Sequence, residues 1–123
     1  MRIAEAAERC GLTIDTIRYY ERAGLLPQVP RGADGKRRFT AESVDWLILL
    51  GSLRKTGMSM KAMARFAALY RKGDQTIPER REILLRHAEQ LSVKRRDLDR
   101  CEAVLTYKLE TYDLREVNKK AEY

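Results

Sequence analysis

The feature that most constrains the fold is a long stretch near the C-terminus in which nothing interrupts a helix. From Pro78 to Tyr112 there is no glycine and no further proline. A helix of this length would run roughly 50 Å, and it is not expected to be stable alone in water. Leucines recur along it every seven residues, at Leu84, Leu91, Leu98 and Leu105. Residues 76–112 are therefore predicted to form a dimerisation coiled coil.

The second row of that coiled-coil face is less regular than the leucines. The positions four residues after them are apolar at Ala88 and Leu109 but charged at Arg95 and Glu102. The alternative is an amphipathic helix that folds back on its own domain. The residues after Tyr112 are mostly polar, so residues 113–123 are expected to form a frayed tail.

A helix-turn-helix is predicted at the other end of the chain. Ile3 to Arg9 has helical character, residues 10–12 contain a glycine suited to a tight turn, and Thr13 is a good N-cap for a second helix that ends near Gly24. Ile14 and Ile17 share the inner face of that helix. The side chains left to point outward are those of Asp15, Thr16, Arg18 and Tyr19.

This outer face has the chemistry of a helix that reads the major groove of DNA. Arginine can bind a guanine edge with two hydrogen bonds, threonine can contact base edges and tyrosine can reach a phosphate. The plain alternative is an ordinary amphipathic surface helix. The chain carries 25 Lys and Arg against 18 Asp and Glu, a net charge of +7. That charge favours a polyanionic partner, with nucleic acid ahead of an anionic membrane.

A basic hairpin is predicted to follow. Asp34-Gly35 is a two-residue turn signal. The cations around it are Arg31, Lys36, Arg37 and Arg38. We interpret this segment as a wing whose cations lie along the phosphate backbone, although a solvated surface hairpin has the same pattern.

Two more helices complete the predicted DNA-binding domain, residues 1–72. Thr40 caps a helix to about Thr56, and Ser59 caps another to about Tyr70. Trp46 is expected to anchor the core rather than to form a ligand platform. The Met and aromatic stripe of the last helix is likewise expected to pack in the core rather than to line a pocket.

In this order the elements resemble the MerR family of bacterial transcriptional regulators. The most specific match is the IRYYE sequence at residues 17–21, followed by GLL at residues 24–26. The resemblance implies a mainly α fold, a winged helix-turn-helix followed by a long dimerisation helix in an antiparallel coiled coil. It also implies a homodimer that bends and untwists promoter DNA so that RNA polymerase can use it.

The resemblance also assigns roles to individual side chains. It places Arg18 and Tyr19 at the groove, and it gives contacts with the DNA backbone to Tyr20, Arg31, Arg37 and Arg54. Together with the outward and wing residues, the predicted DNA-binding set is Thr13, Asp15, Thr16, Arg18, Tyr19, Tyr20, Arg31, Lys36, Arg37, Arg38 and Arg54.

The sequence departs from family patterns where an effector would bind. No cysteine follows the long helix, and Ser52 stands near the place where thiol-stress members often carry a lone cysteine. Cys101 is the only candidate sensor on the long helix, and its other interpretation is a small packing residue. Two cysteines are too few for a disulfide framework, which together with the absence of a signal peptide predicts a cytoplasmic protein.

No enzymatic constellation is visible in the sequence. There is one histidine, His87, and neither a CxxC nor an HExxH motif, so no metal, no cofactor and no catalytic activity are expected. No apolar run is long enough for a membrane span. The main hypothesis is a sequence-specific regulator bound to double-stranded promoter DNA. The alternatives are a sensor-less repressor that acts by occupancy and a coiled-coil scaffold protein.

Overall fold

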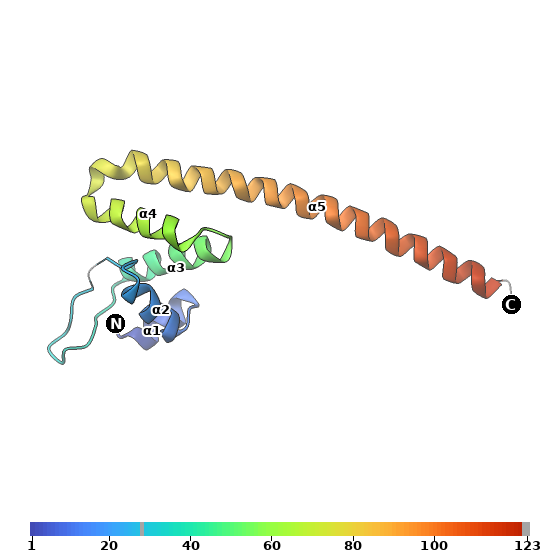
Figure 1. The fold of residues 1–123 in the computed structure, drawn as a ribbon. Coiled ribbons are helices and arrows are strands. Elements are labelled where there is room, and N and C mark those ends of the chain that lie inside the picture. Colours follow the sequence, from blue (N-terminus) through green and yellow to red (C-terminus); the bar gives the residue numbers. More distant parts are fainter. Residues whose placement is uncertain (28, 122–123) are drawn as a thin grey trace. The chain divides into compact units, whose positions relative to one another are not determined.

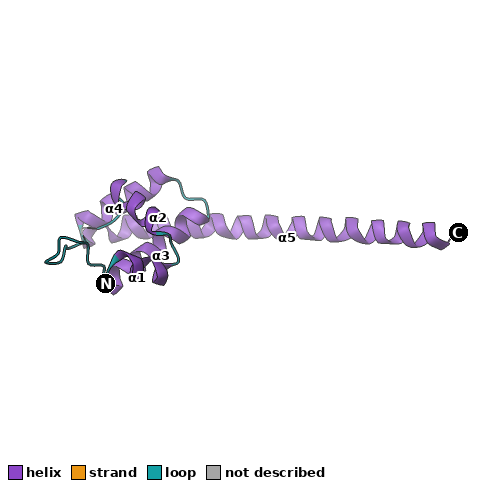
Figure 2. Cartoon of the chain, turned by 90° about the horizontal axis from the view of Figure 1, so that it is seen from below, coloured by secondary structure: helices purple, strands orange, loops and turns teal. Residues whose placement is uncertain are grey.

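The computed structural model describes residues 1–27 and 29–121, and within these ranges the regular elements are all helical (Figures 1 and 2). In chain order they are α1 (Ile3–Cys10), α2 (Ile14–Arg22), α3 (Ala41–Lys55), α4 (Met60–Lys72), a 3-10 turn (Asp74–Thr76) and α5 (Ile77–Ala121). The chain divides into two compact units, Met1–His87 and Ala88–Tyr123.

The predicted helix-turn-helix is present in the first unit. Gly11 ends α1 with a φ of +72°, a conformation that glycine adopts without strain. The side chain of Thr13 accepts a hydrogen bond from the backbone N–H of Thr16 and so caps α2 as expected. Because α1 packs against both α2 and α3, the outer face of α2 is held on a packed three-helix base.

Trp46 anchors the core of this unit, as the sequence predicted. Its ring stacks on Phe66 of α4, with 5.5 Å between the ring centres. Its Nε1–H donates to the carbonyl oxygen of Leu25 at 2.8 Å, just after α2. Trp46 therefore joins α3 to α4 and to the segment that follows α2. The largest side chains with almost no exposure are Phe39, Ile17, Leu25, Leu47, Leu50 and Met63.

The wing, defined here as residues 30–39, is a loop closed by one isolated antiparallel bridge between Arg31 and Arg37. Its turn differs from the expected two-residue type. Gly35 has a φ of +77°, whereas Asp34 keeps a negative φ. The N–H of Gly35 donates to the Gly32 carbonyl, and the N–H of Gly32 donates to the Lys36 carbonyl. The turn therefore uses three residues, with the glycine alone in the left-handed conformation.

The first turns of α5 belong to the first unit, which therefore extends beyond residue 72. Ile83 and Leu84 pack against its core, and His87 is only 6 % exposed. The alternative of a helix folded back on its own domain thus describes residues 77–87. The hydroxyl of Thr76 donates to the Leu69 carbonyl at 2.6 Å, which joins the 3-10 turn to α4.

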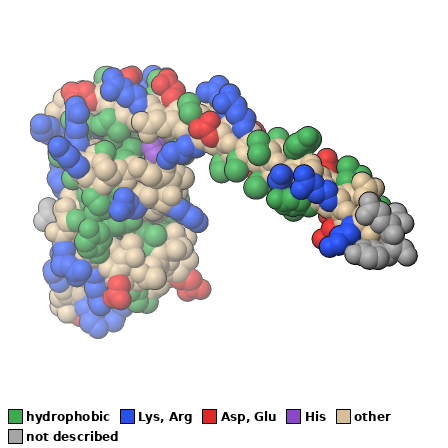
Figure 3. Space-filling view, turned by 45° about the vertical axis from the view of Figure 1, so that its right-hand side comes forward, with side chains coloured by type: hydrophobic (Ala, Val, Ile, Leu, Met, Phe, Trp, Pro, Cys, Tyr) green, Lys and Arg blue, Asp and Glu red, His purple; other side chains and the backbone are tan. Residues whose placement is uncertain are grey.

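In the second unit, α5 continues to Ala121, so the frayed tail expected after Tyr112 is helical instead. Residues 122 and 123 of that tail lie outside the described residues. Large hydrophobic side chains of this unit are exposed, as the green atoms along α5 in Figure 3 show. They are Val93, Leu98, Val104, Leu105, Tyr107, Leu109, Tyr112, Leu114 and Val117.

None of the helices in residues 1–27 and 29–121 combines the length and the apolar character of a membrane span. In the same part of the chain, no three His, Cys, Asp or Glu side chains cluster in a way that could hold a metal ion.

Candidate nucleic-acid interface

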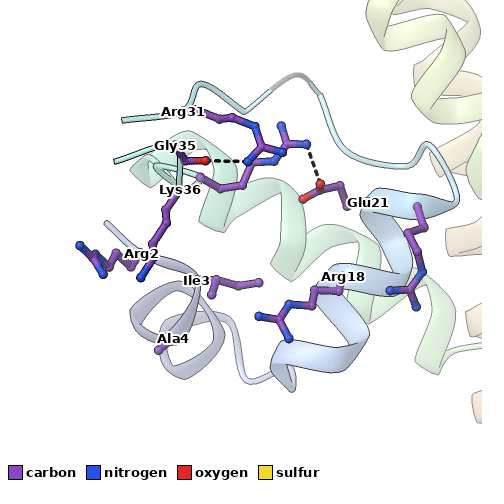
Figure 4. Close-up of a pocket in the computed structure, with 10 residues that line it drawn as sticks. Arg2, Ile3, Ala4, Arg18, Glu21, Arg31, Gly35 and Lys36 are labelled. Carbon is purple, nitrogen blue, oxygen red and sulfur yellow. Dashed lines mark hydrogen bonds and ion pairs between the residues drawn. The ribbon is translucent and has the colours of Figure 1, made fainter. Parts of the chain in front are cut away.

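A cationic groove of about 540 Å³ lies between the first two helices and the wing (Figure 4). Its lining comes from the start of α1, from the exposed side of α2 and from both arms of the wing. The residues are Arg2, Ile3, Ala4, Arg18, Glu21, Arg22, Arg31, Gly35, Lys36 and Arg37. Six of these ten carry positive charge and one carries negative charge, so the groove favours a polyanion.

The outward face of α2 supplies the groups suited to reading bases. Arg18 is exposed and lines the groove, and Tyr19 is 48 % exposed beside it on the helix. Asp15 is exposed as predicted. The hydroxyls of Thr13 and Thr16 bond to each other at 2.8 Å, so these two predicted contact residues form the N-terminal cap of α2.

Wing cations Arg31 and Lys36 lie at the groove surface, as Figure 4 shows. The guanidinium of Arg31 donates to the carbonyl oxygen of Gly35 at 2.6 Å, which holds the two arms of the wing together. Lys36 is exposed. A long, flexible ammonium at the lip of a groove is suited to a phosphate contact as a point charge.

Arg37 lines the groove, and its guanidinium has two partners within the protein. One terminal nitrogen of its guanidinium lies 2.6 Å from Glu21 Oε1, and the other donates to the carbonyl oxygen of Val29 at 3.1 Å. Its Nε is buried without a hydrogen-bond partner. The guanidinium is therefore held by Glu21 and by the Val29 carbonyl, two contacts that the sequence did not indicate, and its contact with the DNA backbone stays a prediction.

Two other predicted backbone contacts have little free surface or are already bonded. Tyr20 is 4 % exposed and belongs to the core. Burial raises the pKa of the Tyr20 hydroxyl, an effect that nearby Arg54 partly offsets, so the phenol is neutral at physiological pH. The guanidinium of Arg54 donates to the carbonyl oxygen of Met58 at 3.3 Å while the residue remains exposed.

The wing tip is organised around Asp34. Its carboxylate pairs with Arg2 at 2.8 Å and with Arg38 at 3.4 Å. It also accepts a hydrogen bond from the backbone N–H of Lys36, which is the main reason why the pKa of Asp34 is lowered. The carboxylate therefore stays charged at neutral pH and pairs with two arginines, of which Arg2 lines the groove.

Arg2 and Arg22 line the groove although the sequence did not mark them as contacts. Arg2 precedes α1 by one residue, and Arg22 is the last residue of α2. Both are cations at the ends of the predicted helix-turn-helix. The interpretation of the outer face stopped at Tyr19, which left Arg22, one turn further along the helix, unassigned.

The two cysteines differ in accessibility. Cys101 is exposed on α5 in the second unit. Cys10 is partly buried, and its thiol lies 3.7 Å from the carbonyl oxygen of Ala7. Of the two thiols, the one of Cys101 is the more open to a reagent.

Comparisons with known proteins identify the family that the chain resembles. The family model described as "MerR family regulatory protein" matches residues 2–39, and the model described as "MerR, DNA binding" matches residues 44–107. An HTH-type transcriptional regulator of Haemophilus influenzae is 41 % identical over 109 residues, which cover 89 % of this chain and 81 % of the relative.

Solved structures are similar over most of the chain. HiNmlR, described as a MerR family regulator lacking the sensor domain and bound to promoter DNA, superposes with a TM-score of 0.83 at 40 % identity, over 91 % of this chain and 89 % of that one. A MerR family transcriptional regulator from Bacillus thuringiensis superposes with a TM-score of 0.81 at 27 % identity, over 90 % of this chain and 97 % of that one.

Proposed function

The chain belongs to the MerR family of DNA-binding transcriptional regulators, and we propose that it acts as a homodimer on a pseudo-palindromic site in promoter DNA. Members of this family are regulators rather than enzymes. The observation that carries the proposal is the cationic groove between α2 and the wing. A surface with this charge suits a duplex, because phosphate contacts supply much of the affinity of DNA-binding proteins.

Within the groove, we assign base reading to the outer face of α2 and backbone contacts to the cations around it. Arg18 is the principal reader, with Tyr19 and Asp15 on the same face. Lys36 and Arg31 contact phosphates from the wing, and Arg54 does so after a small rearrangement of its side chain. Arg2 and Arg22 join this set because they line the same groove.

Dimerisation is assigned to the second unit. Leu98, Leu105 and Leu109 are each more than half exposed on α5. A helix with such a surface is stabilised when a second copy buries it, and an antiparallel pair would give the two-fold symmetry that a pseudo-palindromic site requires. We therefore divide the chain into a DNA-binding unit and a dimerisation helix.

The regulatory action proposed for the dimer is distortion of promoter DNA for use by RNA polymerase in the cytoplasm. Many phosphate contacts can offset the energy needed to bend and untwist a duplex. A second candidate is repression by occupancy without any sensor. It is favoured by the similarity to HiNmlR, which is described as lacking the sensor domain. If a thiol-reactive signal exists, the exposed Cys101 is the residue to receive it.

The test is a footprint of the purified protein on the DNA upstream of its own and neighbouring genes, at several salt concentrations. Protection centred between widely spaced promoter elements, with kinked DNA, would support distortion. Protection that overlaps a normally spaced promoter would support occupancy. Binding that does not weaken as salt rises would contradict the assignment of the cationic groove.

A further inference from the structure

Glu21 is the one acidic residue among the residues that line the DNA-facing groove. A carboxylate in that position opposes a polyanion, so electrostatics alone gives no reason for its presence. Its Oε1 lies 2.6 Å from a terminal nitrogen of Arg37, and the two side chains are 31 % and 29 % exposed. Figure 4 shows Glu21 on α2, with a dashed line that marks its ion pair.

Arg37 connects three segments of the first unit. It binds Glu21 on α2 and the carbonyl oxygen of Val29 in the loop that enters the wing. Its backbone forms the bridge with Arg31 on the opposite arm of the wing. Arg37 therefore connects α2, the entry loop and the two arms of the wing through its side chain and its backbone together.

The wing depends on contacts with the rest of the first unit because few backbone hydrogen bonds join its own two arms. Its arms share a single bridge, and the N–H of Arg38 donates to the carbonyl oxygen of Pro30. Isolated two-stranded hairpins are marginal in water. A half-buried, charge-assisted bond of 2.6 Å is shorter and stronger than an exposed ion pair. The Glu21–Arg37 pair is therefore well suited to hold the wing at a fixed place relative to α2.

We propose that Glu21 is a positioning residue for DNA recognition, which sets the separation between α2 and the wing so that Arg18 and Lys36 contact the duplex together. This inference rests on the proposed DNA-binding groove. It predicts that removing Glu21 weakens binding to DNA, which is opposite to the change that simple electrostatics predicts. If Glu21 only added negative charge, or only kept Arg37 away from phosphates, its removal would strengthen binding to DNA.

Two substitutions separate these cases. Glu21→Gln and Glu21→Ala remove the same charge, but only glutamine keeps an oxygen that Arg37 can donate to. The probe is the tightest duplex selected from a random pool by the wild-type protein, with a scrambled duplex beside it. We expect Glu21→Ala to weaken binding to the selected duplex about tenfold and Glu21→Gln to weaken it clearly less. The slope of log affinity against log salt concentration should become shallower by about one unit in the alanine variant.

The control is Glu5→Ala. Glu5 lies on α1, is exposed and pairs with Arg9 at 3.0 Å, so its loss changes the charge equally without loosening the wing. The inference is overturned if Glu21→Ala and Glu21→Gln bind the selected duplex with the same affinity. It is also overturned if both variants bind this duplex more tightly than the wild type does. Failure of the wild type to select any duplex would instead contradict the proposed function itself.

A second measurement does not depend on DNA. Nitroxide labels at Ala23→Cys and Ala33→Cys, in a background with Cys10→Ser and Cys101→Ser, report the distance between the end of α2 and the wing tip. We expect a narrow distance distribution with Glu21 present and a broader one in Glu21→Ala. An unchanged distribution in a variant with wild-type helix content would overturn the positioning role.

Discussion

The imidazole Nε2 of His87 lies 2.7 Å from the hydroxyl oxygen of Thr56, which joins α5 to the C-terminal end of α3. The Thr56 hydroxyl donates to the carbonyl oxygen of Ser52 at 2.7 Å. The C-terminal end of α3 and the start of the long helix are thus joined by one hydrogen-bonded pair.

Replacing His87 by alanine is expected to destabilise the first unit. The change removes a buried ring and its hydrogen bond with the Thr56 hydroxyl, which together should lower the free energy of unfolding by about 2–3 kcal/mol. Urea unfolding measures this. Arg86→Ala is the control, because Arg86 is exposed and makes only an i,i+4 pair with Glu82. A His87→Ala midpoint equal to that of the control would contradict the assignment.

Arg18→Ala is expected to reduce selectivity for the cognate duplex. Loss of a bidentate base contact should weaken specific binding by about 1–3 kcal/mol while scrambled DNA is bound nearly as before. Competition between the two duplexes measures the ratio. Arg9→Ala, an exposed arginine on α1 that does not line the groove, should leave the ratio unchanged. Retained selectivity in Arg18→Ala would remove Arg18 as a reader.

Asp34→Asn is expected to strengthen binding to all duplexes by a similar factor. Asparagine keeps an oxygen for the Lys36 N–H but releases Arg2 and Arg38 from the carboxylate. Arg38 then becomes available to phosphates, and Arg2 can contact them without competition from the carboxylate, so the salt dependence of binding should steepen. Titrations at several salt concentrations test this, with Asp45→Asn on α3 as a charge-matched control. Weaker binding of Asp34→Asn would show that the ion pairs shape the wing for DNA.

Leu98→Glu is expected to convert the protein to a monomer. Leu98 is 63 % exposed in the single chain, and a buried carboxylate in a helix pair is strongly unfavourable. Sedimentation equilibrium measures the mass. Arg96→Glu also adds a carboxylate, but it lies roughly on the opposite side of α5 and should leave the dimer intact. A dimeric Leu98→Glu protein would place the interface elsewhere.

Local sequence patterns were enough to predict the helices of the first unit. Each helix there is set by neighbours in the chain. Thr13 and Thr40 cap α2 and α3, and Gly11 ends α1. Trp46 was predicted as a core residue because a large aromatic on an apolar helix face is usually buried.

The side-chain contacts of the interface were beyond such patterns. Glu21 and Arg37 are far apart in the chain, as are Arg2 and Asp34, and no spacing rule brings either pair together. The pattern of a basic hairpin predicts phosphate contacts for all its arginines, and it does not reveal which of them also bind groups within the protein. The turn of the wing and the tail after Tyr112 also differ from the sequence prediction. Asp34 kept a negative φ where a three-residue turn allowed it, and α5 continued through polar residues that are good helix formers.

The position of Trp46 determines which part of the protein tryptophan fluorescence reports on. It is the single tryptophan of the chain, and it lies inside the first unit with its N–H bonded to Leu25. Tryptophan emission therefore follows the loss of structure around residues 1–87 and does not register the second unit directly. Circular dichroism follows every helix, including residues 88–121 of α5. If the two units melt separately, one sample will give two transition curves that do not coincide.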